Sequence, residues 1–163
     1  MRKNSLLLPE NGYQRHVVLV APEVHWNTGN IGRTCLGTGT DLHLVRPLGF
    51  SLNDKHVRRA GLDYWHRVRL TVHDTFDAFM EKMQPQKKEL AFFTKRADKS
   101  FREMPGSKRL FLVFGAETLG LPKALITSYW EAAYRIPITD DIRCLNLSTA
   151  VGIALYESLR SII

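Results

Sequence analysis

Short runs of β-branched and aromatic residues alternate along the chain with polar or helix-forming stretches, and this alternation constrains the fold most strongly. Runs of this length and composition predict β-strands. The strands are expected at HVVLVAP from His16, DLHLVRP from Asp41, RVRLTVH from Arg67, ELAFFTK from Glu89, RLFLVFG from Arg109 and YRIPI from Tyr134. Strands that alternate with helices predict an α/β fold, in which a mainly parallel sheet is flanked by helices.

The stretches between these runs predict the helices. They are expected at residues 28–38, 57–61, 75–83, 123–130 and 147–162. In the last helix, Val151, Leu155, Leu159 and Ile162 are spaced to form one apolar stripe that faces a core. The polar residues 95–108 are expected to form a mobile surface loop. With 163 residues, no repeat and no linker, the chain is the right size for one domain.

The charge of the chain points to a polyanionic partner. Lys and Arg number 23 against 16 Asp and Glu, which gives a formal net charge of +7 and a pI near 9.6. Such a balance favours binding to nucleic acid, although an excess of basic residues can also serve solubility alone.

Cysteine usage and the N-terminus bear on the compartment. Cys35 and Cys144 are far apart and form no CxxC pair, which argues against a disulfide framework and against a structural zinc site. The N-terminal apolar run is three leucines long, too short for a secretory signal, and no segment approaches the length of a membrane span. We therefore expect a soluble cytoplasmic protein with no metal and no membrane partner.

Polar residues follow the first expected strand in the segment HWNTGNIGRT. In an open α/β sheet, ligands bind at the carboxyl ends of the strands. Asn27 can cap the following helix, and Gly29 and Gly32 allow a ligand to approach the backbone closely, so exposed amides here are suited to a phosphate. Arg33 would project about one turn into that helix. The alternative is a capped helix with a solvated arginine.

A dinucleotide-binding fingerprint is absent from the most similar glycine-rich segment. GTGTDL, from Gly37, begins like GxGxxG but has Leu42 in place of the third glycine. It also precedes a strand and does not open a helix, so the match fails.

The segment FGAETLGLP follows the strand at RLFLVFG. Gly115 ends the strand without a side chain, Glu117 is an acid in a turn between apolar residues, and Pro122 lies near the first position of a helix. This pattern suits a ligand site, but an acid at this place can also simply cap the helix.

The third segment is DIRCLNLSTAVGIALYESL, from Asp141. Asn146 or Ser148 can cap the final helix, and a helix needs only one good cap. Arg143 and Cys144 stand on the same loop, which faces the other two segments. The surplus of polar side chains predicts a binding site, whereas the alternative is an irregular helix start with solvated side chains.

Taken in order, NTGNIGR, FGAETLGLP and RCLNLSTAVGIALYE resemble the three motifs of the SPOUT superfamily of S-adenosylmethionine-dependent RNA methyltransferases, and DKHVRRAGLDYW adds a fourth likeness. The resemblance covers nearly the whole chain from His16 onward. It points to the compact single-domain branch similar to tRNA (cytidine/uridine-34-2'-O)-methyltransferase, which has no separate RNA-binding domain. It implies a single methyltransferase domain over residues 15–163, preceded by an N-terminal extension at residues 1–14.

The resemblance also implies properties that sequence patterns do not predict. The C-terminal part would form a trefoil knot, a feature essentially absent from other folds. S-adenosylmethionine would bind bent within the knotted loops, a homodimer would complete the active site across its interface, and the partner would be the anticodon stem-loop of tRNA.

Matching this sequence to the motifs implies roles for individual residues. The cofactor would be lined, largely through backbone groups, by Phe92, Gly115, Ile136, Cys144 and Leu145. The catalytic polar set would be Arg33, Glu117, Asn146 and Ser148. RNA-binding positions would be Asn27, Asn30, Lys55, Arg58, Arg59 and Tyr156.

The expected reaction depends mainly on the alignment of the two reacting groups. A ribose 2'-hydroxyl must attack a sulfonium methyl group in line, and such positioning is worth about 7 to 11 kcal/mol. Arg33 is expected to stabilise the oxyanion that develops on the attacking oxygen. The proton would go to Glu117 or to an RNA phosphate.

Further basic and aromatic residues are candidates for RNA contacts. Phosphates would meet Lys95, Arg96, Lys99 and Arg102 in addition to the basic residues at positions 55, 58 and 59. Unpaired bases would stack on Trp26, Tyr64 and Trp65, for which core packing is the alternative.

Two other functions stay open at this point. One is a basic RNA-binding module that keeps the pocket without transferring a methyl group, and the other is methylation of ribosomal RNA by the same chemistry. The joint presence of Arg33, Glu117, Asn146 and Ser148 argues against the first, since binding alone does not require them. The lack of an appended RNA-binding domain argues against the second.

Overall fold

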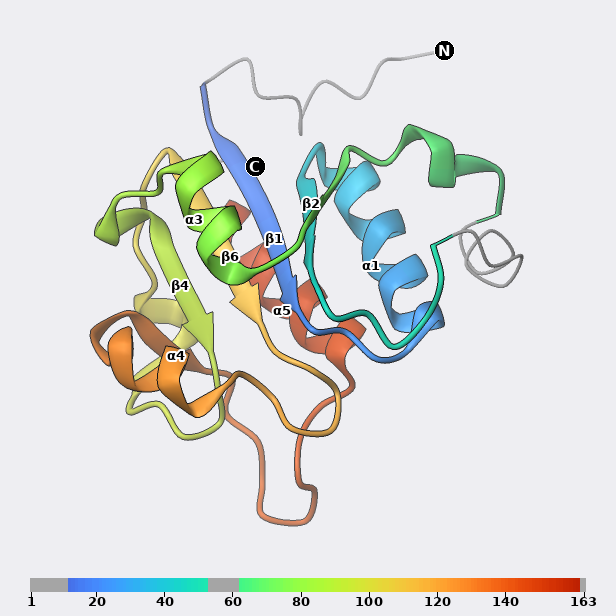
Figure 1. Ribbon diagram of the computed structural model, residues 1–163. Helices are drawn as coiled ribbons and strands as arrows, with labels where there is room; N and C mark the ends of the chain where they lie inside the picture. Colours follow the sequence, from blue (N-terminus) through green and yellow to red (C-terminus); the bar gives the residue numbers. More distant parts are fainter. Residues whose placement is uncertain (1–11, 53–61, 162–163) are drawn as a thin grey trace.

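The computed structural model describes residues 12–52 and 62–161 (Figure 1). Within them, seven strands form one sheet in the order β3-β2-β1-β6-β4-β7-β5, and every pairing is parallel. The strands are β1 (Gln14–Val20), β2 (Asp41–Val45), β3 (Leu70–His73), β4 (Leu90–Phe93), β5 (Lys99–Ser100), β6 (Arg109–Phe114) and β7 (Ala133–Arg135). The predicted α/β fold with a parallel sheet is confirmed.

Helices cover both faces of the sheet (Figure 1). One face carries α1 (His25–Thr38) and α5 (Leu147–Leu159), and the other carries α3 (Phe76–Met83) and α4 (Lys123–Ser128). Short 3₁₀ turns are η3 (Leu62–Arg67), η4 (Lys87–Glu89), η5 (Phe101–Glu103) and η6 (Trp130–Ala132).

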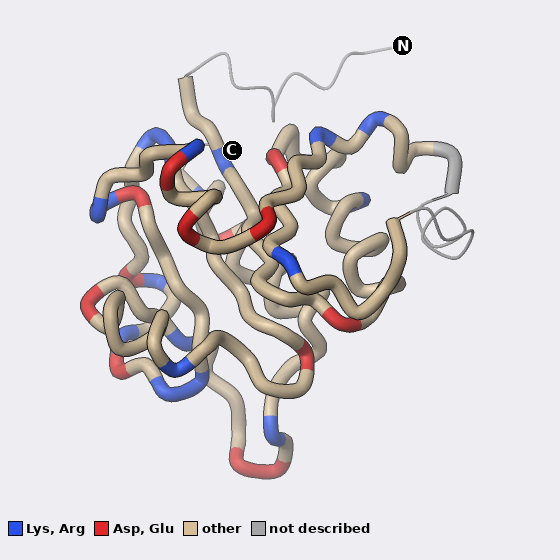
Figure 2. Tube along the Cα trace, viewed as in Figure 1, with Lys and Arg blue, Asp and Glu red and all other residues tan. Residues whose placement is uncertain are grey.

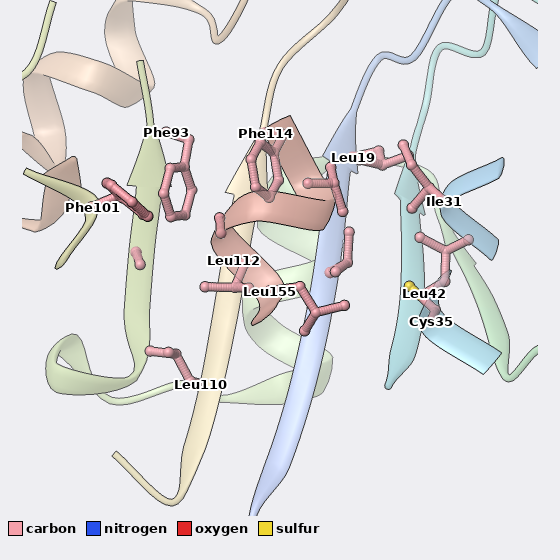
Figure 3. Packing of buried hydrophobic residues seen from close by; sticks show 14 of the residues in the cluster. Leu19, Ile31, Cys35, Leu42, Phe93, Phe101, Leu110, Leu112, Phe114 and Leu155 are labelled. Carbon is pink, nitrogen blue, oxygen red and sulfur yellow. The ribbon is translucent and has the colours of Figure 1, made fainter. Parts of the chain in front are cut away.

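Two apolar layers follow from the alternation of side chains along the strands. Val17 and Leu19 point to the α1 and α5 layer, whereas Val18 and Val20 point to the α3 layer. Figure 3 shows the first layer, in which Leu155 of α5 packs over the central strands. Strands buried on both faces explain why their sequences are continuous apolar runs.

The structure differs from the expected elements at several places. The segment 95–108, expected to be a loop, contains β5 and η5. Ser100 and Glu103 form a capping box around η5, which turns Phe101 into the core. The strand expected from Tyr134 is β7, which ends at Arg135. The helix expected at 57–61 and nearly all of the extension at 1–14 lie outside the described residues.

The final helix is held at both ends. Asn146 caps its start, and the predicted stripe is confirmed for Val151, Leu155 and Leu159, which are buried, while Ile162 lies outside the described residues. At the other end, the buried Arg15 guanidinium donates hydrogen bonds to the Ser158 carbonyl at 2.9 Å and to the Ser158 hydroxyl at 3.2 Å. These bonds satisfy groups at the C-terminal end of α5 that the helix itself leaves unpaired.

Three buried histidines lie on adjacent strands beneath Phe79 of α3. Nδ1 of His16 is 3.1 Å from Nε2 of His43, and Nδ1 of His43 is 3.0 Å from Nε2 of His73. Burial lowers the pKa of His16 to about 4 and that of His43 to about 3, and it lowers the pKa of His73 as well. The imidazoles are therefore neutral in the folded protein at pH 7.

Acidification should destabilise the fold through these histidines. The unfolded chain binds protons below about pH 6.5 that the folded chain does not bind, so stability is lost as the pH falls from there toward the folded pKa values. Between pH 7 and pH 5, His16 and His43 together should lower the free energy of unfolding by about 3 to 4 kcal/mol. Urea unfolding at both pH values measures this change.

The exposed His66 on η3 provides the control for this measurement. His66→Gln removes a histidine outside the buried row of three, so it tests whether the pH dependence belongs to that row. An equal free energy of unfolding at pH 7 and pH 5 would contradict the expectation.

Candidate active site

Three loops meet at the carboxyl edge of the sheet (Figure 1). They are residues 21–24 after β1, residues 115–121 after β6, and residues 136–146 between β7 and α5. The second and third contain residues that the sequence singled out, whereas the segment HWNTGNIGRT, expected to be the first loop, lies in helix α1 directly after residues 21–24. The three come together because β1 pairs with β6 and α5 lies against α1.

The loop after β6 is a tight hairpin. The Ala116 N–H donates to the Gly120 carbonyl at 3.2 Å, and the Gly120 N–H donates to the Ala116 carbonyl at 2.9 Å. A Cβ atom on Gly115 would lie 2.0 Å from the Gly120 carbonyl carbon and 2.1 Å from the Leu121 nitrogen. Position 115 therefore has room for glycine alone, because the neighbouring atoms are backbone and cannot move aside.

The Glu117 carboxylate joins this hairpin to the loop after β1. It accepts hydrogen bonds from the backbone N–H of Glu23 at 2.7 Å, from that of Val24 at 3.2 Å, and from Nδ2 of Asn27 at 3.1 Å. In return, the Glu23 carboxylate accepts from the Thr118 N–H at 2.9 Å and from its hydroxyl at 2.8 Å. The two acids thus clamp the loops reciprocally.

This clamp corrects two points of the sequence analysis. Helix α1 begins at His25 with Val24 as its N-cap, so Asn27 is not the cap but a buried residue of the first turn. Its side chain faces Glu117 because that carboxylate, from a distant segment, offers a stronger acceptor than the local backbone. Sequence reasoning missed Glu23, although an acid directly after a strand at the ligand edge was an available signal.

The hydrogen bonds continue from Asn27 into the third loop. Oδ1 of Asn27 accepts from Nδ2 of Asn146 at 3.0 Å, and Oδ1 of Asn146 accepts from the Ser148 N–H at 2.9 Å and from its hydroxyl at 2.7 Å. The Ser148 hydroxyl also accepts from Nδ2 of Asn30 at 3.1 Å. Because an ionised Glu117 only accepts, the orientation of each amide along this network follows from it.

The surplus of polar residues before the last helix is thereby explained. Asn146 caps α5 with its oxygen and binds Asn27 with its nitrogen. The structure brings together five of the residues predicted from sequence, and we call them the polar network: Asn27, Asn30, Glu117, Asn146 and Ser148.

Arg33 flanks the polar network on the exposed side of α1. It lies one turn beyond Asn30, and residues three apart on a helix are neighbours. Its guanidinium stands over the ring of Tyr64, 5.6 Å from the centroid. Arg33 therefore remains an exposed cation beside the network.

Of the residues expected to line a cofactor, Phe92 lies in the last part of β4, and the others follow β6 or β7, the two neighbours of β4 in the sheet. Ile136 and Leu145 are half-buried, and Cys144 is exposed. The Phe92 side chain is buried and stacks on Tyr129 at 4.6 Å, so only its backbone can face a ligand at this edge.

The loop of residues 136–146 is tied to the end of β4. Nζ of Lys95 donates to the Arg143 carbonyl at 3.2 Å.

Across residues 12–52 and 62–161, no group of three or more His, Cys, Asp or Glu is placed to hold a metal ion. In the same part of the chain, no helix is long and apolar enough to cross a membrane.

The expected RNA-binding residues have different surroundings. Lys55, Arg58 and Arg59 lie outside the described residues. Tyr156 and Trp26 are exposed, with 49% and 60% of their surface accessible. The Trp65 ring instead packs against Gly32, where an added Cβ would approach it to 2.5 Å, so its role is in packing.

Lys and Arg occur at positions distributed along the whole described chain (Figure 2). Among those expected to meet phosphates, Lys95, Arg96 and Arg102 are exposed, whereas Lys99 is partly covered and pairs with Glu131.

Relatives resemble this chain over nearly its whole length. A relative from Listeria monocytogenes is 50% identical over 148 residues, which cover 89% of this chain and 86% of the relative. A relative from Burkholderia cenocepacia, named tRNA (cytidine(34)-2'-O)-methyltransferase, is 42% identical over 146 residues, which cover 89% of this chain and 94% of the relative.

Solved structures show the same fold. One, described as giving structural insights into the 2-OH methylation of C/U34 on tRNA, superposes with a TM-score of 0.82 at 39% identity and covers 91% of this chain and 96% of that chain. An AdoMet-bound rRNA methyltransferase from Sinorhizobium meliloti superposes with a TM-score of 0.80 at 26% identity and covers 92% of this chain and 57% of that chain.

The family profile described as SpoU rRNA Methylase matches residues 14–156, which include all three loops and the whole polar network. Together with the identities of 42% and 50% to relatives of similar length, this match confirms the family resemblance seen in the sequence. The chain belongs to the SpoU rRNA methylase family.

Proposed function

We propose that this chain transfers a methyl group from S-adenosylmethionine to the ribose 2'-hydroxyl of nucleotide 34, a cytidine or uridine, in the anticodon loop of tRNA. The observation that carries this function is the polar network, which joins the three motif loops in a chain that is 42% identical to a tRNA (cytidine(34)-2'-O)-methyltransferase over 94% of that protein. The reaction takes place in the cytoplasm, where tRNA is found.

The residues at the sheet edge fit S-adenosylmethionine. The hairpin at Gly115 leaves no space for a side chain, so its backbone groups form the surface there. Ile136 and Leu145 contribute half-buried apolar side chains. Cys144 is exposed at the same edge, and Phe92 contributes its backbone groups. These are neutral groups, which suit a nucleoside held by backbone hydrogen bonds and apolar contacts. When bound, the cofactor supplies an electrophilic methyl group.

The polar network positions the reacting groups. Three N–H donors already surround the Glu117 carboxylate, so its role is to hold the loop after β1 and the Asn27 amide, and an RNA phosphate is the better proton acceptor. Arg33 is free of this network and supplies a cation for the oxyanion that develops on the 2'-oxygen. Asn146 and Ser148 hold the start of α5 and the loop before it against α1, through hydrogen bonds with Asn27 and Asn30.

The two alternatives are less well supported. A module that only binds RNA has no need for a reciprocal clamp at the methyl-transfer motifs, and an rRNA substrate is the property of a relative at 26% identity, of which this chain covers 57%.

Analysis of modified nucleosides tests the function directly. Mass spectrometry of tRNA from cells that lack this protein should show the loss of 2'-O-methylcytidine or 2'-O-methyluridine at position 34, and the purified protein should restore it with S-adenosylmethionine. Unchanged modification at position 34, with loss at an rRNA site, would instead support the rRNA alternative.

The same proposal includes the C-terminal trefoil knot. It is supported by the path of the chain, since β4 lies between β6 and β7, and yet α5, which follows β7, packs against β6 and β1. The loop of residues 136–146 must therefore bring the chain back past two strands.

The proposal also includes a homodimer, for which α1 and α5 offer the surface. Trp26 on α1 and Ile153 and Tyr156 on α5 are exposed apolar side chains on two helices that lie side by side. Exposed apolar residues that gather on one face mark an interaction site, and a second copy of the chain would cover them.

Light scattering at micromolar concentration should give the mass of two chains. Ile153→Lys should shift the protein to one chain, because a buried unpaired ammonium at an interface is strongly unfavourable. Ile142→Lys is the matched control, since Ile142 is also exposed but stands on the loop before α5. A monomeric wild-type protein that methylates tRNA would contradict the dimer.

A further inference from the structure

A cleft of about 810 Å³ opens at the carboxyl edge of the sheet, on the α3 and α4 side. Its apolar surface comes from Val20, Val45, Phe76 and Leu125, and its polar groups include Arg46 and Asp77. Pro122 of the FGAETLGLP segment lines it, but none of the residues to which the sequence analysis gave a catalytic, cofactor or RNA role does.

The cleft and the polar network are connected through the chain that follows β1. Ala21 lines the cleft and has a φ of 53°, a conformation that residues with a side chain rarely adopt. Two residues after this turn, the Glu23 N–H donates a hydrogen bond to the Glu117 carboxylate at 2.7 Å. Strained backbone of this kind persists where the surroundings impose it, and it clusters at functional sites.

The segment after β2, which lines another side of the cleft, also contacts the loop after β1. Gly49, which follows the cleft residues Arg46 to Leu48, donates its N–H to the Pro22 carbonyl at 2.9 Å. A Cβ on Gly49 would lie 2.6 Å from the Glu23 carbonyl oxygen, so the two loops are in close contact. The loop of residues 21–24 therefore borders both the cleft and the polar network, and a nucleotide next to one at the polar network would reach the cleft across this loop.

The chemistry of the cleft indicates which part of the RNA it takes. The apolar side chains suit the flat face of a base, which stacks readily on such surfaces. The residues that line the cleft include two acids, Asp74 and Asp77, and one cation, Arg46, which pairs with Asp74 at 3.4 Å. The rim therefore has a net negative charge, which repels a phosphate. Figure 2 shows acidic positions along α3, which forms this rim.

Ionised carboxylates only accept hydrogen bonds. A base with an exocyclic amino group, adenine, cytosine or guanine, offers two N–H donors at its edge, and carboxylates recognise such amino groups in nucleic acids. Uracil offers a single N–H between two carbonyl oxygens, which an acidic rim disfavours.

We propose that this cleft binds an unpaired, amino-bearing base of the substrate RNA that lies next to the methylated nucleotide, with Asp77 accepting a hydrogen bond from the amino group. The inference rests on the proposed function, because it takes the RNA at the polar network as given. It adds a specificity site for the loop sequence on the side of the sheet opposite to α1 and α5.

Asp77→Asn provides the first test, with Glu81→Gln as its matched control. Both residues are exposed acids of α3, but Glu81 does not line the cleft. Removal of an acid from a basic protein tightens RNA binding slightly through general electrostatics, and Glu81→Gln should show this effect. Asp77→Asn should instead weaken the binding of an anticodon stem-loop by roughly ten-fold, because a neutral amide oxygen accepts a hydrogen bond from the amino group less strongly than a carboxylate does. Fluorescence anisotropy measures both.

The RNA offers a second test that needs no protein variant. Stem-loops in which each nucleotide beside the target is made abasic, or replaced by uridine, should bind the wild-type protein more weakly at one of the two positions. At that position Asp77→Asn should bind the intact and the uridine-substituted RNA equally well, whereas the abasic RNA should bind more weakly to both proteins, because it has no base to stack on the apolar side chains of the cleft. Equal effects of Asp77→Asn and Glu81→Gln, or wild-type binding that ignores both neighbours, would overturn the inference.

The outcomes separate this inference from the proposed function. A wild-type protein that methylates the ribose at position 34 while Asp77→Asn behaves as Glu81→Gln contradicts the cleft alone. A wild-type protein that binds the stem-loop with the expected base preference, but forms no methylated ribose, supports the cleft and contradicts the methyl transfer.

Discussion

Replacement of Arg33 by Ala should reduce methyl transfer by roughly 10²-fold or more, which is the cost of removing one group that stabilises a developing oxyanion. Affinity for S-adenosylmethionine should remain nearly unchanged. Arg33 stands on the exposed side of α1, whereas the residues matched to the cofactor lie in β4 or follow β6 and β7. A charge that acts only on the attacking oxygen contributes to the transition state and not to the ground state.

Single-turnover rates at saturating RNA measure this effect, and Arg102→Ala is the matched control. Arg102 is another exposed arginine, on η5, and it makes no bond to the polar network. As a phosphate contact it should lower RNA affinity and flatten its salt dependence, while the rate at saturating RNA stays normal. If Arg33→Ala behaves in the same way as Arg102→Ala, Arg33 is a phosphate contact and its catalytic assignment is wrong.

Replacement of Gly115 by Ala should abolish cofactor binding and destabilise the fold by about 3 kcal/mol or more, at the upper end of overpacking costs. The added Cβ would lie 2.0 Å from the Gly120 carbonyl carbon, so the hairpin between Ala116 and Gly120 must open. Opening displaces Glu117 from the backbone of Glu23, and misplacement of a site by about 1 Å can cost 10²-fold in rate.

Calorimetry with S-adenosylhomocysteine and thermal unfolding test this prediction together. Gly37→Ala is the control, because Gly37 lies in α1 and a Cβ there meets no atom within 4 Å. It should stabilise the protein by about 0.5 to 1 kcal/mol, since alanine is the better helix former. Normal binding of S-adenosylhomocysteine by Gly115→Ala would show that the hairpin backbone does not form the cofactor surface.

Local patterns were sufficient to predict most of the fold. The apolar runs at His16, Asp41 and Arg109 became β1, β2 and β6, because a strand buried on both faces has few residue types available. The region of β5 and η5 was missed, since a two-residue strand and a single turn leave almost no periodicity. Phe101 stands among polar neighbours in the sequence, so its burial was not predictable from the local pattern. It is buried because a capping box fixes the turn that carries it.

The candidate site was predictable as a set of loops and less so as a set of roles. Asn146 was expected as a helix cap with polar groups to spare, and the structure gives the spare amide nitrogen a partner in Asn27. The reciprocal clamp of Glu23 and Glu117 joins residues 94 positions apart, and short-range patterns contain no information about such a pair. The cleft beside Asp77 was missed for the same reason, since its walls come from four separate segments.

The sequence by itself determined the α/β class, the three loops and the family, because the length and apolarity of strands, the capping of helices and the order of motifs are properties of adjacent residues. Only the tertiary structure decided which polar groups meet: that Asn27 binds Glu117 and does not cap α1, that Trp65 packs while Trp26 is exposed, and that Arg15 holds the end of α5. The physical reason is that a side-chain hydrogen bond forms with the best acceptor within reach, and the parallel sheet, by aligning the ends of β1 and β6, determines which acceptors are within reach.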